Sequence, residues 1–349
     1  LFDDLICKIL KSIMEETDDS TSYRLVKTNN PDWATDALNS PVGKISQALL
    51  YDSRVKELKN NNGFPDKWIK KIEKMLSLKG DLRRHALVFF GHRLNWFYSI
   101  DHKWTEINLL SILNSNDDLD CMALWSGFFW NARYPFPSLY IKLKPYFIDL
   151  AKRKLLKRSG YNRNLASMIL NGWGSIKPED EKRYITHSEL RDVLLSSDEG
   201  FRLNLLSDLR QWTKNNKPES KPNWSDLSKE LLRDVWPRQI SVKTSNISAS
   251  LFKIAFEANE KMPELTDIVL PLLTKINHGN SISLSLYDSK RIIAQYPKQT
   301  LALLHGILPE DVSTWPYETD KALENIEKAD IKLRYDERLI ELKRKWNSR

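Results

Sequence analysis

Apolar residues recur at helical spacing along most of this chain. Between 223 and 276, three consecutive segments (226–236, 246–260 and 263–276) place their apolar residues three, four, seven or eight positions apart. This spacing predicts amphipathic α-helices with one wide apolar stripe each. A short helix of this kind cannot bury its stripe alone, so we expect consecutive helices to stack on one another, as in helical-repeat proteins.

The same period predicts helices over most of the remaining sequence. The longest pattern runs from 82 to 100, with Leu82, Ala86, Phe89, Phe90, Leu94 and Phe97 on one stripe. Almost no stretch alternates at period two, and 282–286 is the single weak strand candidate. We therefore expect an all-α fold: a HEAT-like, irregular α-solenoid with little or no β-structure.

The polar segment 214–223 has the composition of a linker. It predicts an N-terminal helical subdomain (1–213), a linker (214–223) and a C-terminal helical-repeat subdomain (224–349).

Helix starts are marked by capping residues. Ser40 precedes Pro41, and Thr186 with Glu189 forms a capping box. Trp104 before Thr105 predicts a start with Thr105 as the cap and Trp104 in a hydrophobic staple. The sequence Trp224-Ser225-Asp226 repeats the beginning of this helix-start motif.

Composition narrows the class of protein. The chain has 349 residues, of which 41% are apolar, so a disordered chain is excluded. No run has the length of a membrane span, and Cys7 and Cys121 carry no pairing signal, so we expect a cytoplasmic protein without membrane contact. Because the helical pattern is already present at Leu1, we expect a piece of a longer polypeptide.

The net charge of +8 is concentrated in one segment. Residues 131–165 contain nine basic residues against one acid, which accounts for the excess of the whole chain. A basic helix at 138–158 with nearby tyrosines is typical of binding to a nucleic-acid backbone. A solvated face is the more frequent reason for such a run, and cations also favour a helix C-terminus. The candidate binding residues are Lys142, Lys144, Lys152, Arg153, Lys154, Lys157 and Arg158.

Motifs for catalysis or metal binding are missing. The sequence has no glycine-rich phosphate loop, no zinc-protease motif, no nucleophile elbow and no kinase signature. His85 and His92 share one side of a predicted helix, but seven residues is too wide for a helical metal pair and no further donors are near, so we expect both to be structural. Carboxylate pairs such as Asp117 with Asp118 lie in polar connections, where we expect solvated side chains. We expect no catalytic residue and no metal site; a hydrolase built from scattered carboxylates is a third, weaker alternative.

Several segments resemble a known group of proteins. They are LLRDVWPRQISVKTSNISASLFKIAFE from 231, MPELTDIVLPLLTKI from 262, YPKQTLALLHGILPEDVSTWPY from 296, LRYDERLIELKRKW from 333, GHRLNWFYSIDHKWTEINLLSIL from 91 and MALWSGFF from 122. They resemble the C-terminal helical region of large bacterial anti-phage defence proteins of the sirtuin-like, NAD-hydrolase type. The resemblance covers 32–346, and its shared positions are Trp-Pro, Pro-x-x-x-Leu and apolar stripes, which define a fold and carry no chemistry.

The resemblance implies a role. In such proteins the helical region holds an NAD-hydrolysing effector inactive, assembles the oligomer and senses a phage component. None of the effector's nucleotide-binding residues has a counterpart in this chain, so NAD is expected only for a domain that precedes it. We therefore expect a non-catalytic scaffold and sensor without a cofactor of its own, with a phage trigger protein or a neighbouring subunit as partner. The alternative is a nucleic-acid-binding module that uses the basic helix 138–158.

Overall fold

The computed structural model describes residues 2–18, 31–115, 117–130, 133–153, 159–215, 217, 219, 221–283, 286 and 290–349. Within these residues the regular elements are twenty α-helices and several short 3-10 or π turns, and the one β-type pairing is an isolated bridge between Ile176 and Arg183. The all-α prediction is confirmed. The strand candidate at 282–286 is wrong in its described part, because Ile282 lies in a turn and Ser283 and Leu286 are helical.

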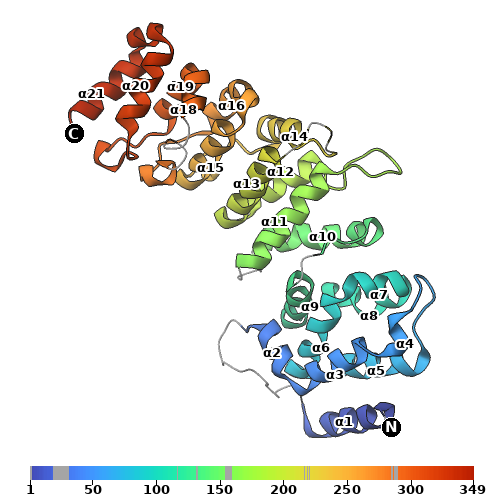
Figure 1. Cartoon of the computed structure of the whole chain (residues 1–349). Helices are drawn as coiled ribbons and strands as arrows, with labels where there is room; N and C mark the ends of the chain where they lie inside the picture. The colour runs from blue at the N-terminus through green and yellow to red at the C-terminus, as the bar shows by residue number, and fades with distance from the viewer. Residues whose placement is uncertain are drawn as a thin grey trace. The chain divides into compact units, whose positions relative to one another are not determined.

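The chain divides into two compact units (Figure 1). Unit 1 comprises 1–146 and 155–164, and unit 2 comprises 147–154 and 165–349. Helices α10 (Pro137–Arg153) and α11 (Ser159–Gly174) contribute to both. The predicted linker 214–223 lies inside unit 2, where α13 (Glu199–Lys214) and α14 (Trp224–Glu230) are in contact. The predicted subdomain boundary there stays a prediction.

Unit 1 is built around α6 (Gly80–His92), which contacts α2, α3, α5 and α9. Nine of its thirteen residues are buried, including Leu87 and Val88 as well as the predicted stripe residues Leu82 and Phe90. A helix that is buried on all sides serves as the centre of a bundle. The expectation of a single apolar stripe is therefore wrong for this helix. The other elements of unit 1 are α1 (Phe2–Glu16), α2 (Trp33–Asn39), α3 (Pro41–Leu50), α4 (Ser53–Lys56), α5 (Asp66–Leu76), α7 (Leu94–Ile100), α8 (His102–Asn108), the 3-10 helix η1 (Leu110–Asn114) and α9 (Asp118–Trp130).

Two glycines allow α6 and α9 to cross in backbone contact. A Cβ atom on Gly127 of α9 would lie 1.8 Å from the Val88 carbonyl oxygen of α6. Conversely, a Cβ atom on Gly91 of α6 would lie 2.1 Å from the Leu124 carbonyl oxygen of α9. Only residues without a side chain permit this approach.

The predicted helix 82–100 is interrupted at Arg93. Helix α6 ends at His92, Arg93 adopts φ −105° and ψ 15°, and α7 continues from Leu94. After the break, Phe97 packs in an aromatic cluster with Phe64, Trp68, Trp96 and Trp104, with ring centroids 5.0–6.1 Å apart. Tertiary packing therefore outweighs the continuous helical period, because the straight helix would carry Phe97 elsewhere.

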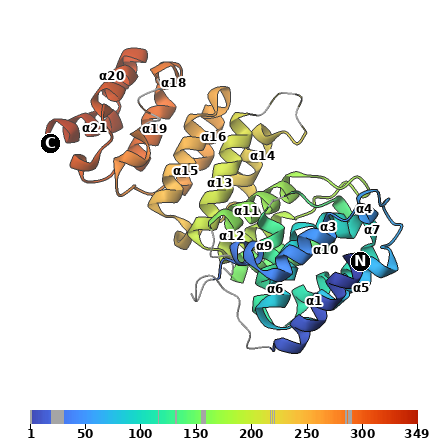
Figure 2. The ribbon, with the colours of Figure 1, turned by 60° about the horizontal axis from the view of Figure 1, so that its bottom comes forward.

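Unit 2 is a series of stacked helices (Figure 2). Helix α13 packs on α14 and α15 (Ser245–Phe256), α15 packs on α16 (Met262–Val269) and α19 (Pro297–Ile307), and α19 packs on α20 (Thr319–Ala329) and α21 (Glu337–Asn347). Each helix thus buries its stripe against the next, as the repeat hypothesis requires. The remaining elements are α12 (His187–Ser196), the π turn η2 (Leu231–Val235), η3 (Ile240–Val242), η4 (Asn259–Lys261), η5 (Leu270–Leu272), η6 (Gly279–Ser281), α18 (Lys290–Gln295), η7 (Val312–Thr314) and η8 (Ile331–Tyr335).

Charged pairs link successive layers of unit 2. Arg210 on α13 donates to Glu257, directly after α15, with Nε 2.9 Å from Oε2. Lys229 on α14 donates to Glu264 on α16 at 3.0 Å. Each pair joins a helix to the following layer at its solvent-facing rim.

Among the helices that the structure describes, none combines the length and the apolar character that crossing a membrane requires.

Candidate functional site

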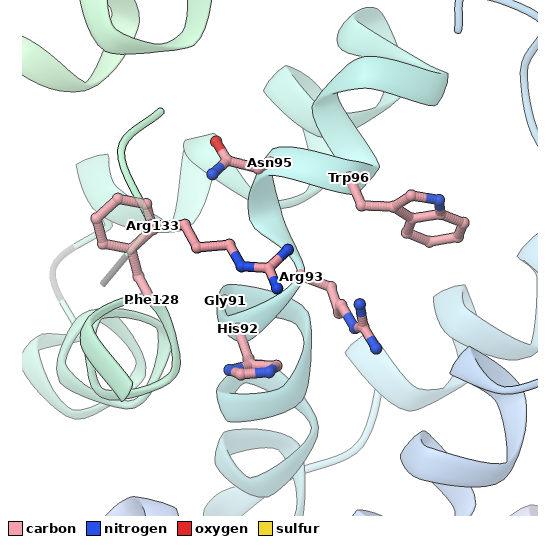
Figure 3. Close-up of a pocket in the computed structure, with 7 residues that line it drawn as sticks. All are labelled: Gly91, His92, Arg93, Asn95, Trp96, Phe128 and Arg133. Carbon is pink, nitrogen blue, oxygen red and sulfur yellow. The ribbon is translucent and has the colours of Figure 1, made fainter. Parts of the chain in front are cut away.

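The break between α6 and α7 leaves a cavity of about 50 Å³ beside α9 (Figure 3). Arg133, in the segment that follows α9, extends across the cavity between Asn95 of α7 and His92 of α6. Phe128 of α9 closes one side, whereas the Trp96 indole points away. The volume is enough for a few water molecules or for one small polar group, and it is too small for a whole cofactor.

Local structure holds His92 in place. Its ring packs against Trp130 with centroids 5.2 Å apart, and its backbone lies at the glycine crossing of α6 and α9. Burial lowers the pKa of His92, and the positive charges of Arg93 and Arg133 lower this pKa further. The imidazole is therefore neutral at pH 7, with one nitrogen able to donate and the other able to accept.

The cavity carries an excess of positive charge. Two arginines line it and no acidic residue does. Neither Arg93 nor Arg133 forms an ion pair with any residue that the structure describes, although the Arg93 guanidinium lies over the Tyr51 ring at 5.9 Å. Two cations without counter-charges beside a buried imidazole favour an anionic occupant.

Two buried polar atoms of residues that line the cavity lack hydrogen-bond partners among the described residues. They are Nδ1 of His92 and Oδ1 of Asn95. The Asn95 amide is oriented by its Nδ2, which donates to the Tyr134 carbonyl oxygen at 3.3 Å. Because a carbonyl can only accept, this bond places the acceptor Oδ1 at the unsatisfied position. Buried polar atoms without partners carry a desolvation cost that no hydrogen bond offsets.

The predicted basic patch is divided in the structure. Lys142 and Lys144 belong to unit 1, whereas Lys152 and Arg153 belong to unit 2, because the boundary between the units falls within α10. Lys142 pairs with Glu106 at 3.0 Å and Arg153 pairs with Asp149 at 3.2 Å. Lys144 is half-buried, and Lys152 is exposed without an acidic partner among the described residues. Lys154, Lys157 and Arg158 lie outside the described residues, so a binding role for the patch stays a prediction.

The remaining candidate side chains serve contacts within unit 1. His85 is fully buried in α6 and lies edge-on to Trp33, with ring centroids 6.3 Å apart. Asp117 is an exposed loop carboxylate, as expected, and it also caps a helix. Its Oδ1 accepts from the Leu119 and Asp120 backbone N–H groups at the start of α9, and its Oδ2 pairs with Arg84 at 3.1 Å. No group of three or more His, Cys, Asp or Glu side chains with metal-binding geometry occurs in the described part of the chain.

Another surface of interest lies in the last layers of unit 2. Ile331 and Tyr335 of η8 and Ile340 of α21 are 60%, 80% and 52% exposed. The elements that carry them are in contact with each other and with α20. We call these three residues the η8–α21 apolar surface.

The cavity is not evident from the sequence. The pattern predicts a structural role for His92, and Arg133 stands out only as one of the basic residues of 131–165. Asn95 and Arg93 had no assigned role, since they fall inside what the period predicts as one continuous helix. The segment Gly91-His92-Arg93 and the nearby Asn95 are a sequence signal for a break in the helix, because polar residues interrupt the apolar stripe there. Nothing in the sequence brings Arg133, some forty positions later, to the same place.

Comparisons with protein families, with curated proteins and with solved structures find no match to this chain. Its function therefore has to be inferred from the geometry and chemistry of its own residues.

Proposed function

We propose that this chain is the non-catalytic scaffold and sensor region of a larger bacterial anti-phage defence protein. In this role unit 2 binds another protein, either a phage trigger or a neighbouring subunit. The observation that carries the proposal is the η8–α21 apolar surface on a series of stacked helices. Stacked helical arrays provide extended surfaces for protein recognition.

The composition of this surface supports protein binding. Large exposed side chains of the Ile and Tyr type stand among charged groups: Glu327 accepts hydrogen bonds from Arg334 and from Lys343. Apolar and aromatic residues surrounded by a charged rim are typical of interfaces between proteins. The titratable groups around this surface, Glu327, Arg334 and Lys343, are already paired with one another. A scaffold therefore fits it better than an enzyme.

A double variant tests the proposal. Tyr335→Asp with Ile340→Asp places two charges on the η8–α21 apolar surface, at positions already exposed to solvent, so folding should be unaffected. We expect the variant to lose protection in plaque assays, in cells that express the defence protein, and to lose binding to the trigger or to other subunits in sedimentation experiments. Ile107→Asp is the matched control, because Ile107 on α8 is 71% exposed and lies in unit 1.

Two results would refute the proposal. One is full protection and unchanged assembly with the double variant. The other is NAD hydrolysis by this chain alone, which we expect to be undetectable because the proposal assigns that activity to another domain.

The basic helix carries the alternative function, nucleic-acid binding. Lys152 is exposed on its last turn without an acidic partner among the described residues. This alternative requires retention on DNA or RNA that falls steeply with salt, whereas an apolar protein interface is far less salt-sensitive. It also requires that reversing Lys154, Lys157 and Arg158 to Glu abolishes the retention. If retention is absent, or persists in the triple variant, this alternative is excluded.

A further inference from the structure

We propose that a second hollow of unit 1, beside the end of α7, binds an adenine base. Phe136 provides the surface on which the base stacks, and the side-chain amides of Asn60 and Asn61 provide its hydrogen-bond partners. The inference does not depend on the η8–α21 apolar surface, which belongs to unit 2. It is also separate from the basic patch, because none of the seven candidate residues of that patch lines this hollow.

Three segments that are far apart in the sequence form this hollow, which has a volume of about 390 Å³ and is partly open to solvent. We call it the Phe136 hollow. The volume lies within the range of about 300–1,000 Å³ that is typical of small-molecule sites, so a base with its ribose can enter. The residues that line it are Asn60, Asn61, Tyr98, Ser99, His102, Phe136 and Ser138.

The loop that carries the two amides is fixed against α7. The backbone N–H of Asn61 donates to the Ser99 carbonyl oxygen at 2.9 Å, and the N–H of Gly63 donates to the Ile100 carbonyl oxygen at 3.1 Å. Asn61 has φ 62°, in the left-handed region where Asn is one of the few favoured residues. The backbone of this loop is therefore already ordered, which lowers the entropy cost of binding a ligand.

Both amides are accessible to a ligand. The side chains of Asn60 and Asn61 are exposed, and neither forms a hydrogen bond with any residue that the structure describes. His102, at the start of α8, is exposed as well and adds a ring nitrogen that can donate or accept. Hydrogen bonds to a ligand at these positions need no rearrangement of the protein.

Phe136 offers an aromatic face at the same hollow. Its side chain is 50% exposed and makes no ring contact with any described residue. Pro137 follows it at the first position of α10, and a proline restricts the backbone of the residue before it. Bases stack on aromatic side chains of this kind whatever their sequence, because every base has a flat π face.

The hydrogen-bonding groups favour adenine over the other bases. A side-chain amide carries a donor and an acceptor next to each other, which matches the N6 amino donor and the N7 acceptor of adenine. Guanine presents two acceptors at the same edge and is usually bound by Arg or Lys. No Arg, Lys, Asp or Glu is among the residues that line the Phe136 hollow, so a neutral ring suits it better than a charged group.

Adenine can come from two sources that share this chemistry: a free nucleoside or nucleotide, and an unpaired base in single-stranded nucleic acid. Titration with adenosine, with AMP and with an eight-residue oligo(dA) distinguishes them. A free ligand predicts that adenosine and AMP bind as tightly as the oligonucleotide. A strand predicts that the oligonucleotide binds more tightly, and that its affinity falls with salt because it makes additional phosphate contacts.

The experiment uses the whole chain and measures binding by calorimetry with adenosine, guanosine and glucose. We expect saturable binding of adenosine with one site per chain. Guanosine should bind more weakly because it can stack but cannot pair with the amides, and glucose should not bind because it has no flat π face.

Three variants make the test specific. Phe136→Ala should weaken adenosine binding about tenfold or more, as expected when one stacking contact is lost, whereas Phe136→Tyr should retain binding. Asn60→Ala with Asn61→Gly should retain stacking but bind adenosine and guanosine equally, and glycine preserves the left-handed backbone at 61. Tyr317→Ala is the matched control, because it removes an aromatic ring that is 78% exposed in unit 2, and it should leave binding unchanged.

Three outcomes would overturn the proposal. They are the absence of saturable adenosine binding, equal binding of adenosine and guanosine or glucose by the wild-type chain, and unchanged binding in Phe136→Ala. The last outcome would place the ligand elsewhere on the protein.

Discussion

Replacing Gly127 by Ala tests the backbone contact between α6 and α9. The new Cβ atom would lie 1.8 Å from the Val88 carbonyl oxygen and 2.9 Å from the His92 nitrogen. Both neighbours are backbone atoms, so no side-chain rotation relieves the overlap. The two helices must separate by about 1.5 Å to restore ordinary contact, and a gap of that size forfeits much of the dispersion energy along the crossing.

The magnitude follows from two opposing effects. Overpacking of a filled core costs about 1–3 kcal/mol, and a backbone overlap that cannot rotate away belongs at the upper end. The helix itself gains about 1 kcal/mol when Gly is replaced by Ala. We expect a net loss of about 2 kcal/mol from the free energy of unfolding of unit 1. Gly91→Ala, whose Cβ would meet the Leu124 carbonyl oxygen at 2.1 Å, should behave similarly.

The double variant Gly91→Ala with Gly127→Ala provides the sharper measurement. One separation of the helices relieves both overlaps, so the second Ala should cost much less than the first. The coupling energy in a double-mutant cycle should therefore approach the shared overpacking cost of about 3 kcal/mol, in the direction of non-additivity. Urea denaturation with tryptophan fluorescence measures the free energies, with hydrogen exchange to locate the change in α6 and α9. The two units can give separate transitions, so each is fitted by itself.

The control is Gly160→Ala near the start of α11. A Cβ atom there meets nothing within 4 Å, so only the helix propensity changes and the variant should be neutral or slightly more stable. Strictly additive losses for Gly91→Ala and Gly127→Ala would refute the shared crossing. So would a loss no larger than that of the control.

Further predictions concern single buried or paired groups. Hydrogen bonds from Lys343 and, to a smaller extent, from Arg334 lower the pKa of Glu327 from 4.5 to about 2. The contribution of this carboxylate to stability is therefore fully present above pH 4.5 and is lost as the pH falls through about 2. The stability difference between wild type and Glu327→Gln should shrink over that window in acid titrations followed by circular dichroism, and a constant difference would contradict the pairing. Buried Arg202 donates from Nη1 to the carbonyl oxygens of Leu194 at 3.0 Å and Ser197 at 2.8 Å, so Arg202→Met should destabilise unit 2 by about 2–3 kcal/mol in urea, and a neutral effect would show that these carbonyls need no partner.

Local chemistry was predictable where it depends on neighbouring residues. The Ser40 cap is confirmed, because its hydroxyl accepts from the Gly43 N–H at 2.9 Å, and the capping box of Thr186 and Glu189 is present as predicted. The prediction that Thr105 is the N-cap residue is wrong. Asp101 caps this helix, since its Oδ1 accepts from the Trp104 N–H at 2.9 Å, while the Thr105 hydroxyl donates back to the Asp101 carbonyl.

Long-range features were not predictable from the period. The sequence predicts that α6 is amphipathic, but the approach allowed by Gly91 and Gly127 surrounds it with other helices. The break at Arg93 is decided by the packing of Phe97, and Arg133 reaches the cavity only through the course of the chain after α9. Periodicity reports which residues are buried, but contacts between distant segments decide how many sides of a helix are covered.

The layered pairing in unit 2 has a mechanical consequence. Each helix contacts only helices a few elements away in the chain, such as α13 on α15 and α18 on α20, so pulling on α21 does not load the whole unit at once. Under tension from its C-terminal side, unit 2 should yield in successive small steps, beginning with the release of α20 and α21 from α18 and α19. Stretching in an optical trap would therefore give a staircase of short extensions in place of one abrupt rupture.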